Sequence, residues 1–287
     1  MRRKVIFRIL LVDEPHSASR LQQRSFTLST NQPLNILFIG GKNVGKTTLL
    51  NAFANYLSFR TLREAHPARL IVLKPLSFYL GIEGQICTLG NRNYSDPITT
   101  SQCQTYTFDP RFNDGKILHL IDTPSLEDAA QPNQTNTAII QRILNYVNQL
   151  SHLNAVCFLV QPDASQLSTT FQTCFGQLIN LLGRTVRDNV VFCFTNAYTN
   201  FSMPGSTASL LRTMFETYSQ NDMAFNPDNT FFFENRSFRY LIAEQNGVVF
   251  SNADRELYTG IWSESVKESA RLLDYIRQRP VCHIVRK

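Results

Sequence analysis

Short apolar runs alternate with amphipathic segments along most of this chain. Continuous apolar runs without polar alternation are typical of strands that are buried on both faces of a sheet. Three such runs occupy residues 35–39, 155–160 and 190–194. Apolar residues at spacings of three and four predict amphipathic helices as well. These helices cover residues 48–57, 139–150 and 167–178, and Gly183 ends the last one.

A turn signal and two later segments complete the predicted domain. The Asn-Asp-Gly sequence at 113–115 separates apolar strands at 105–108 and 116–121, which predicts a hairpin. A last strand is expected at 230–233 and a closing helix near 256–277. The pattern predicts an α/β fold with three layers, in which helices cover both faces of a mainly parallel sheet with one antiparallel edge strand.

The N-terminal region differs in composition from the rest. Residues 1–33 are expected to form a basic extension, with a possible extra strand and a linker rich in Ser, Thr, Gln and Arg, ahead of a domain at 34–287. The apolar run at 5–12 is interrupted by Arg8 and precedes no small-residue cleavage site, so we interpret it as a strand and not as a secretory signal.

Composition narrows the cellular setting. No apolar stretch approaches the roughly 20 residues needed to cross a bilayer, so no transmembrane segment is expected. The six cysteines contain no Cys-x-x-Cys pair, which favours free thiols and a cytoplasmic protein. The net charge of +6 is spread thinly, and a solvated surface explains it better than acidic lipid or nucleic acid. Nucleic acid is therefore not an expected partner.

One motif carries specific chemistry. Residues 40–47 match the phosphate-binding pattern G-x-x-x-x-G-K-[ST] and lie between a predicted strand and a predicted helix. In this P-loop Lys46 would reach the β- and γ-phosphates as a catalytic cation, and the Thr47 hydroxyl would ligate Mg²⁺. The predicted nucleotide-binding residues here are Gly40, Gly41, Lys42, Asn43, Val44, Gly45, Lys46, Thr47 and Thr48. The alternative is a glycine-rich turn with an exposed lysine.

Two further residues near the motif have open alternatives. Asp122 ends the apolar strand at 116–121, where the second metal ligand of a P-loop protein is expected, although an acidic residue in this place can also cap a helix or form a turn. Asn43 matches a position that ligates a monovalent cation in potassium-stimulated GTPases, or it shapes the loop turn. The sequence thus predicts a three-layer P-loop NTPase fold with a Mg²⁺-nucleotide site.

A resemblance to a family of GTPases follows from three stretches. Residues 122–125 resemble the switch II motif Asp-x-x-Gly of translation-factor-related GTPases, in the branch of septins, the immunity-associated GIMAP GTPases and the chloroplast Toc receptors. Residues 100–103 resemble a GIMAP-type switch I segment, and residues 194–197 with 204–207 are similar to further eukaryotic members of this group.

The resemblance implies a G domain that binds GTP or GDP with Mg²⁺. It implies that Thr100 caps Mg²⁺ and the γ-phosphate during catalysis, and that Thr195 and Asn196 lie beside the base. Asn235, after the last strand, would be another base contact. A solvent-facing loop residue is the alternative for both Thr100 and Asn235. Relatives associate across the nucleotide, so a homodimer or a protein partner is expected.

Three departures from the family pattern bear on activity. Ser125 replaces the switch II glycine, Leu126 stands where Ras-like proteins carry a water-orienting glutamine, and residues 195–198 lack the carboxylate that selects guanine. We therefore expect slow, Mg²⁺-dependent GTP hydrolysis that self-association or a partner stimulates. The alternatives are a non-hydrolysing nucleotide-binding scaffold and, less favoured, an ATPase or a kinase. The kinase is the weakest of these, because the sequence has no Arg-rich lid between the later strands to clamp a second substrate.

Overall fold

The computed structural model describes residues 32–80, 84–90, 101–109, 116–126, 136–162, 164–197, 204–218 and 225–284. Most of the predicted extension at 1–33 lies outside these ranges, so its separation from a domain at 34–287 stays a prediction. Among the described residues no helix is long and apolar enough to cross a membrane. The six cysteines are all free thiols, and all but Cys103 are buried.

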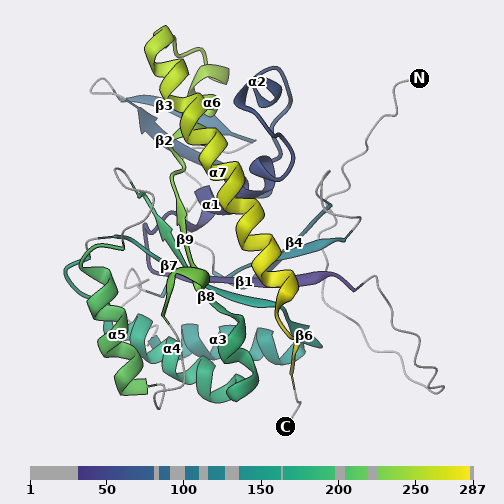
Figure 1. Ribbon diagram of the computed structural model, residues 1–287, viewed down its shortest axis with the longest axis vertical. Helices are drawn as coiled ribbons and strands as arrows, with labels where there is room; N and C mark the ends of the chain where they lie inside the picture. The colour runs from purple at the N-terminus through teal and green to yellow at the C-terminus, as the bar shows by residue number, and fades with distance from the viewer. Residues whose placement is uncertain are drawn as a thin grey trace, which may run out of the picture.

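A six-stranded sheet forms the centre of the molecule (Figure 1), in the order β4-β5-β1-β7-β8-β9. Its strands are β1 (Leu34–Gly40), β4 (Gln104–Phe108), β5 (Leu118–Asp122), β7 (Ala155–Val160), β8 (Val190–Thr195) and β9 (Thr230–Phe233). Every neighbouring pair is parallel except β4 and β5, which form the predicted antiparallel hairpin at one edge. The predicted fold class is confirmed.

Helices cover both faces of this sheet (Figure 1), because side chains of each strand alternate between the faces. On β1, Leu37 and Ile39 pack against one helical layer, whereas Ile36 and Phe38 pack against the other. The first layer contains α3 (Asn136–Gln149), α4 (Thr169–Leu182) and α5 (Thr207–Tyr218). The second contains α1 (Lys46–Tyr56) and α7 (Asn252–Gln278).

Several predicted boundaries shift by a few residues. The helix expected at 48–57 begins at Lys46, because the P-loop ends directly in its first turn. The closing helix expected at 256–277 begins at 252, because Ser251 and Asp254 form a capping box at its N-terminus. The glycine stop at Gly183 is confirmed as the C-cap of α4.

A third packed region was not predicted from the sequence. It contains α2 (Leu62–Ala65), the antiparallel hairpin β2 (Leu76–Leu80) and β3 (Gln85–Leu89), and α6 (Arg236–Gln245). The fully buried Trp262 of α7 packs edge-on against Tyr56 of α1, with ring centroids 4.8 Å apart. This contact joins the third region to the helical layer over the sheet.

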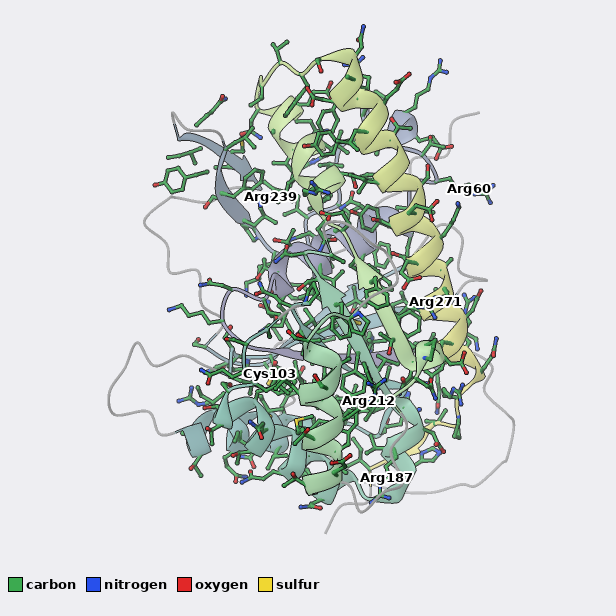
Figure 2. All side chains as sticks on the ribbon, turned by 60° about the vertical axis from the view of Figure 1, so that its left-hand side comes forward. Arg60, Cys103, Arg187, Arg212, Arg239 and Arg271 are labelled. Carbon is green, nitrogen blue, oxygen red and sulfur yellow. The ribbon has the colours of Figure 1, made fainter. Side chains whose placement is uncertain are left out.

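Smaller elements and arginine contacts complete the fold. The small elements are β6 (His152–Leu153) with β10 (Cys282–His283), and the 3-10 helices at Arg184–Asn189 and Pro227–Asn229. Arg271 of α7 lies over the Phe231 ring at 4.0 Å from its centroid, and Arg239 of α6 lies over Phe78 at 4.3 Å (Figure 2). These cation–π contacts hold the two C-terminal helices to the sheet and the β2–β3 hairpin.

Candidate nucleotide-binding site

Two glycines give the loop at 40–47 its shape. A β-carbon on Gly40 would lie 3.0 Å from Leu159 Cβ and 2.8 Å from Val44 Cγ1, so a larger residue would push β1 away from β7. Gly45 directly precedes α1 with a φ of 87°, in the left-handed region that favours glycine. The loop therefore curls tightly between the end of β1 and the start of α1, as the motif predicts.

The start of α1 suits an anion. Its first turn contains no acidic side chain, and Gly45 supplies no side chain to cap it. The backbone N–H groups of a first helical turn lack partners within the helix, and the helix dipole places partial positive charge there. Such a helix start favours a phosphate group.

The conformation of Asn43 supports the loop-turn alternative. Its φ is 60°, a left-handed value that Asn adopts more readily than most residues. The Gln161 side chain donates to the Asn43 carbonyl at 3.3 Å, which ties this turn to the end of β7. The structure thus gives Asn43 a role in loop shape, and its role as a cation ligand stays a prediction.

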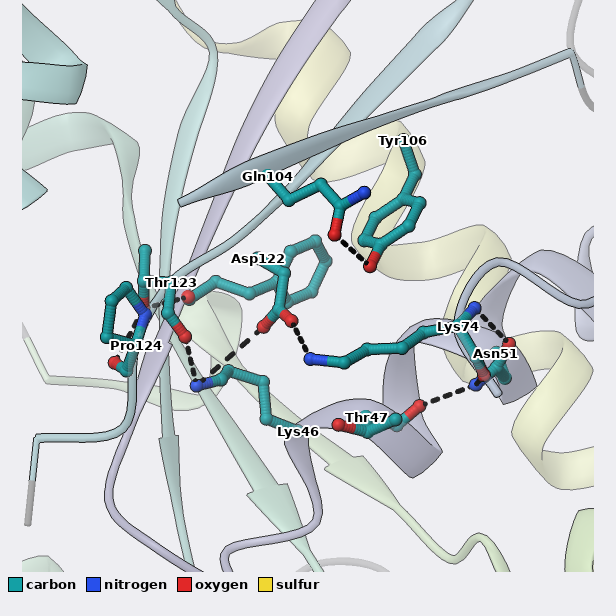
Figure 3. A network of polar contacts seen from close by, with 10 residues as sticks. Lys46, Thr47, Asn51, Lys74, Gln104, Tyr106, Asp122, Thr123 and Pro124 are labelled. Carbon is teal, nitrogen blue, oxygen red and sulfur yellow. Dashed lines mark hydrogen bonds and ion pairs between the residues drawn. The ribbon is translucent and has the colours of Figure 1, made fainter. Parts of the chain in front are cut away.

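Lys46 and Asp122 meet beside the loop (Figure 3). The Lys46 ammonium donates to the Thr123 carbonyl at 2.5 Å and lies 3.7 Å from Oδ1 of Asp122. A second lysine, Lys74, donates to Oδ2 of the same carboxylate at 2.9 Å. Asp122 is fully buried, and among the described residues two ammonium groups lie beside its carboxylate.

Burial sets the protonation chemistry around this carboxylate. Burial lowers the pKa of the Lys46 ammonium below its usual value, and Lys74 lowers it further, while Asp122 opposes the change. Burial raises the pKa of the Cys103 thiol to about 12, with a further contribution from Asp122. Cys103 is therefore a protonated thiol at neutral pH and not a nucleophile.

The segment after Asp122 runs along the start of the P-loop. The Thr123 hydroxyl donates to the Phe38 carbonyl at 2.8 Å, and the Leu126 N–H donates to the Gly40 carbonyl at 3.2 Å. The Leu126 side chain is fully buried in the core beneath α3 and α4. Because this side chain is apolar and buried, it cannot orient a water molecule at a phosphate.

The side chain of Thr195 contacts the P-loop. It ends β8 with no exposed surface, and its hydroxyl donates to the Val44 carbonyl at 2.5 Å. Because the hydroxyl already has this partner, Thr195 stabilises the loop by holding the Val44 carbonyl. Its predicted contact with a base stays a prediction.

Two asparagines lie on adjacent loops at the carboxyl edge of the sheet. Thr195 pairs with Phe233 across β8 and β9, so Asn196 and Asn235 both follow closely on paired strand ends. Asn196 has a φ of 58° and is half-buried. Asn235 is 4% exposed, and no described residue donates a hydrogen bond to its side-chain oxygen. The Asn235 amide oxygen is therefore a buried acceptor without a donor among the described residues.

The structure also places three residues at the candidate site that were not predicted from the sequence. These are Lys74, which pairs with Asp122; Asn51, which holds the backbone beside Lys74; and Glu234, which is buried next to Asn235 and forms an ion pair with Arg236 Nε at 2.9 Å. For Asn51 a signal existed, since it interrupts the apolar face of a predicted helix. For Lys74 there was none, because it lies 48 residues before its partner.

The candidate metal ligands fit Mg²⁺ in donor chemistry. Mg²⁺ prefers hydroxyl, carboxylate and phosphate oxygens, and the Thr47 hydroxyl and Asp122 carboxylate both belong to this set. The Thr47 side chain is half-buried at the start of α1, whereas Asp122 is shared between two lysines. The third predicted ligand, Thr100, lies outside the described residues.

Comparison with known proteins identifies similar solved structures. No protein-family model matches the chain, and no curated protein matches it. Toc33 from Arabidopsis thaliana in complex with GDP and Mg²⁺ is 13% identical with a TM-score of 0.49, covering 88% of each chain. Toc33 with Mg²⁺ and GMPPNP is 13% identical with a TM-score of 0.44 over 88% of this chain and 89% of that one. The G domain of the T. maritima FeoB iron transporter is 12% identical with a TM-score of 0.31, over 75% and 99%.

Proposed function

We propose that this chain is a guanine-nucleotide-binding protein of the G-domain type, which binds GTP and GDP with Mg²⁺ and hydrolyses GTP slowly. The observation that carries the proposal is the geometry of the loop at 40–47. Gly45 turns the backbone into the start of α1, and the Lys46 ammonium is buried beside the carboxylate that ends the neighbouring strand β5. Backbone amides, a helix N-terminus and a lysine together form a phosphate site.

Base recognition is assigned to the adjacent loops after β8 and β9. An asparagine side chain both donates and accepts hydrogen bonds, so Asn196 and Asn235 can read a guanine edge without a carboxylate. The buried Asn235 oxygen, which accepts no hydrogen bond from a described residue, supports this assignment. With no acidic residue at 195–197, the proposed preference for GTP over ATP is modest.

The proposal of slow turnover rests on the two residues at 125 and 126, in the segment that resembles switch II. The side chain of Leu126 is buried in the core, and Ser125 restricts the backbone where the family pattern has glycine. In the proposed mechanism Lys46 would stabilise charge on the β- and γ-phosphates, Thr47 would ligate Mg²⁺, Asp122 would hold this ion directly or through water, and Thr100 would cap the γ-phosphate. A second copy of the chain or a protein partner would supply the missing stimulating group, in a cytoplasmic setting.

Calorimetry of the purified chain with GDP, GTP and ATP tests the binding proposal. Lys46→Met should lose measurable affinity for every nucleotide, because charge-assisted phosphate contacts contribute about 1.5–3 kcal/mol each. The matched control is Lys267→Met, which removes the same charge from an exposed ion pair on α7. Unchanged affinity in a folded Lys46→Met protein would remove the nucleotide-binding proposal. A clear preference for ATP would move the protein out of the GTPase class.

A second candidate function is a nucleotide-binding scaffold that does not hydrolyse. The burial of Leu126 favours this scaffold function, because the side chain belongs to the hydrophobic core. The segment that resembles switch II then has no side chain at this position to orient a water molecule at the γ-phosphate. Bound nucleotide would then stabilise the fold or an assembly surface. Phosphate release measured against bound nucleotide separates the two functions.

A further inference from the structure

The structure gives Asp122 a second cation besides the P-loop lysine. Oδ2 of Asp122 accepts from the Lys74 ammonium at 2.9 Å, while Oδ1 lies 3.7 Å from the Lys46 ammonium. Asp122 has no exposed surface, and the Lys74 side chain is 18% exposed. Each oxygen of this carboxylate therefore faces a lysine.

Lys74 is held in this place by a buried amide on α1. The Asn51 side-chain oxygen accepts from the N–H groups of Leu73 at 2.9 Å and Lys74 at 3.2 Å. Its nitrogen donates to the Lys74 carbonyl at 2.8 Å and to the Thr47 carbonyl at 3.0 Å. Asn51 thus ties the backbone of Lys74 directly to the turn that contains Thr47.

The same arrangement repeats one helical turn later. Asn55 accepts from the Ile71 N–H at 3.0 Å and donates to the Ile71 carbonyl at 2.8 Å. Both asparagines are fully buried, so their hydrogen bonds are shielded from water and costly to break. Together they fix the segment from Ile71 to Lys74 along α1, which positions Lys74 before any ligand arrives.

This placement changes the charge balance of the site. Among the described residues, two ammonium groups lie beside the Asp122 carboxylate at the start of α1, so this carboxylate has cationic partners without a metal ion. In the usual arrangement a carboxylate at this position adds negative charge near the phosphates, and Mg²⁺ neutralises it. Here a Mg²⁺ ion that reached Oδ2 would have to displace a positioned ammonium group.

We propose that Lys74 is a built-in cation for Asp122 and that it makes the affinity of the site for phosphate ligands only weakly dependent on Mg²⁺. Lys74 acts as a positioning residue, since its observed contact is with Asp122. The proposal rests on the phosphate-binding role of the loop in the proposed function. It does not rest on recognition of guanine.

The test measures the affinity of the full chain for GDP and for inorganic pyrophosphate, each with Mg²⁺ and each with a chelator. Affinities of the wild type should differ little between the two buffers. Lys74→Met removes the charge and keeps the chain length, so its affinity in chelator should fall by at least about tenfold while its affinity in Mg²⁺ changes less. Lys74→Arg keeps the charge and should retain metal-independent binding, and Lys267→Met should behave as wild type.

Each outcome separates this proposal from the proposed function. A wild type that binds GDP only with Mg²⁺, with Lys74→Met unchanged in that dependence, would overturn the role of Lys74 and leave the guanine-nucleotide proposal standing. Metal-independent binding of pyrophosphate that Lys74→Met abolishes would support the role even if GDP does not bind. Circular dichroism checks whether Lys74→Met loses thermal stability. If Lys74→Met does not fold, Lys74→Arg provides the test. Binding of neither ligand in either buffer would overturn both proposals.

Discussion

The Thr195 hydroxyl donates a hydrogen bond to the Val44 carbonyl, which joins the end of β8 to the middle of the P-loop across 151 residues. The hydroxyl also lies 3.4 Å from the Val160 carbonyl at the end of β7. One side chain therefore links the loop to the carboxyl ends of two neighbouring strands. The shape of the phosphate-binding loop depends on this link as well as on its own glycines.

Replacing Thr195 with Val should weaken nucleotide binding by loosening the loop. Val has a similar shape but no hydroxyl, so the buried Val44 carbonyl would lose this donor at a cost of about 1–3 kcal/mol. We expect a lower free energy of unfolding and an affinity for GDP that is weaker by about tenfold. Urea denaturation and nucleotide titration measure the two effects. Thr195→Ser keeps the hydroxyl and should restore most of both; equal losses in the two variants would contradict a role for the hydrogen bond.

The contact between β1 and β7 gives a second prediction. In Gly40→Ala the new β-carbon would lie 3.0 Å from Leu159 Cβ and 3.3 Å from the Leu159 carbonyl oxygen, so the backbone itself has to move. Overpacking of this kind costs about 1–3 kcal/mol, and the shift would distort the P-loop. Thermal denaturation should show a lower Tm.

A matched control exists within the same chain. Gly260 lies in the interior of α7, and nothing lies within 4 Å of a β-carbon placed on it. Gly260→Ala should therefore raise the stability by about 0.5–1 kcal/mol, because alanine favours the helix. If both alanine variants raised the Tm, the close approach at Gly40 would not constrain the loop.

The parts of the fold that the sequence predicted are those set by local patterns. Continuous apolar runs identified β7 and β8, and the P-loop motif placed Lys46 between a strand and a helix. The Asn-Asp-Gly sequence at 113–115, which lies outside the described residues, predicted a hairpin from a few neighbouring residues, and the two strands beside it pair as β4 and β5.

The parts that it did not predict depend on contacts between distant segments. The β2–β3 hairpin has exposed apolar residues such as Tyr79 and Ile86, so its pattern does not resemble a buried strand. Lys74 acquires its partner only when the segment after α2 folds against α1. For Asn235 the residue type was informative, but its burial depends on the packing of α6 at the end of β9.

The pH dependence of stability should report the burial of Glu234. Burial raises the pKa of this carboxyl, although hydrogen bonds from Arg236 lower it in part. A glutamate in the unfolded chain loses its proton at about pH 4.3, whereas Glu234 in the folded protein keeps its proton to higher pH. The unfolded state then binds fewer protons, so stability falls as the pH rises through that window.

Glu234→Gln cannot ionise and should escape this loss. The free energy of unfolding of the variant, measured in urea, should therefore gain on that of the wild type as the pH rises from about 4 to about 7. The two proteins share every other titrating group, so their difference isolates Glu234. A wild type that gains on the variant over this range would mean that the ion pair with Arg236 outweighs burial.

The last prediction concerns turnover and the switch II position. Ser125 follows Pro124 beside the P-loop, and the next residue is fixed by the hydrogen bond from the Leu126 N–H to the Gly40 carbonyl. Glycine at 125 would give the backbone more freedom to approach a γ-phosphate. Ser125→Gly should therefore increase GTP hydrolysis, or increase the difference in affinity between GTP and GDP.

In the wild type, hydrolysis should be very slow in dilute protein and should rise with protein concentration. Stimulating groups supplied by a second molecule accelerate phosphoryl transfer by about 10³–10⁵-fold, so their absence in a single chain dominates the rate. Phosphate release per chain is measured across a dilution series for the wild type and Ser125→Gly. Lys46→Met gives the background rate. Fast turnover that does not depend on concentration would contradict the need for a partner, whereas no turnover by either protein at any concentration would favour the scaffold function over the GTPase.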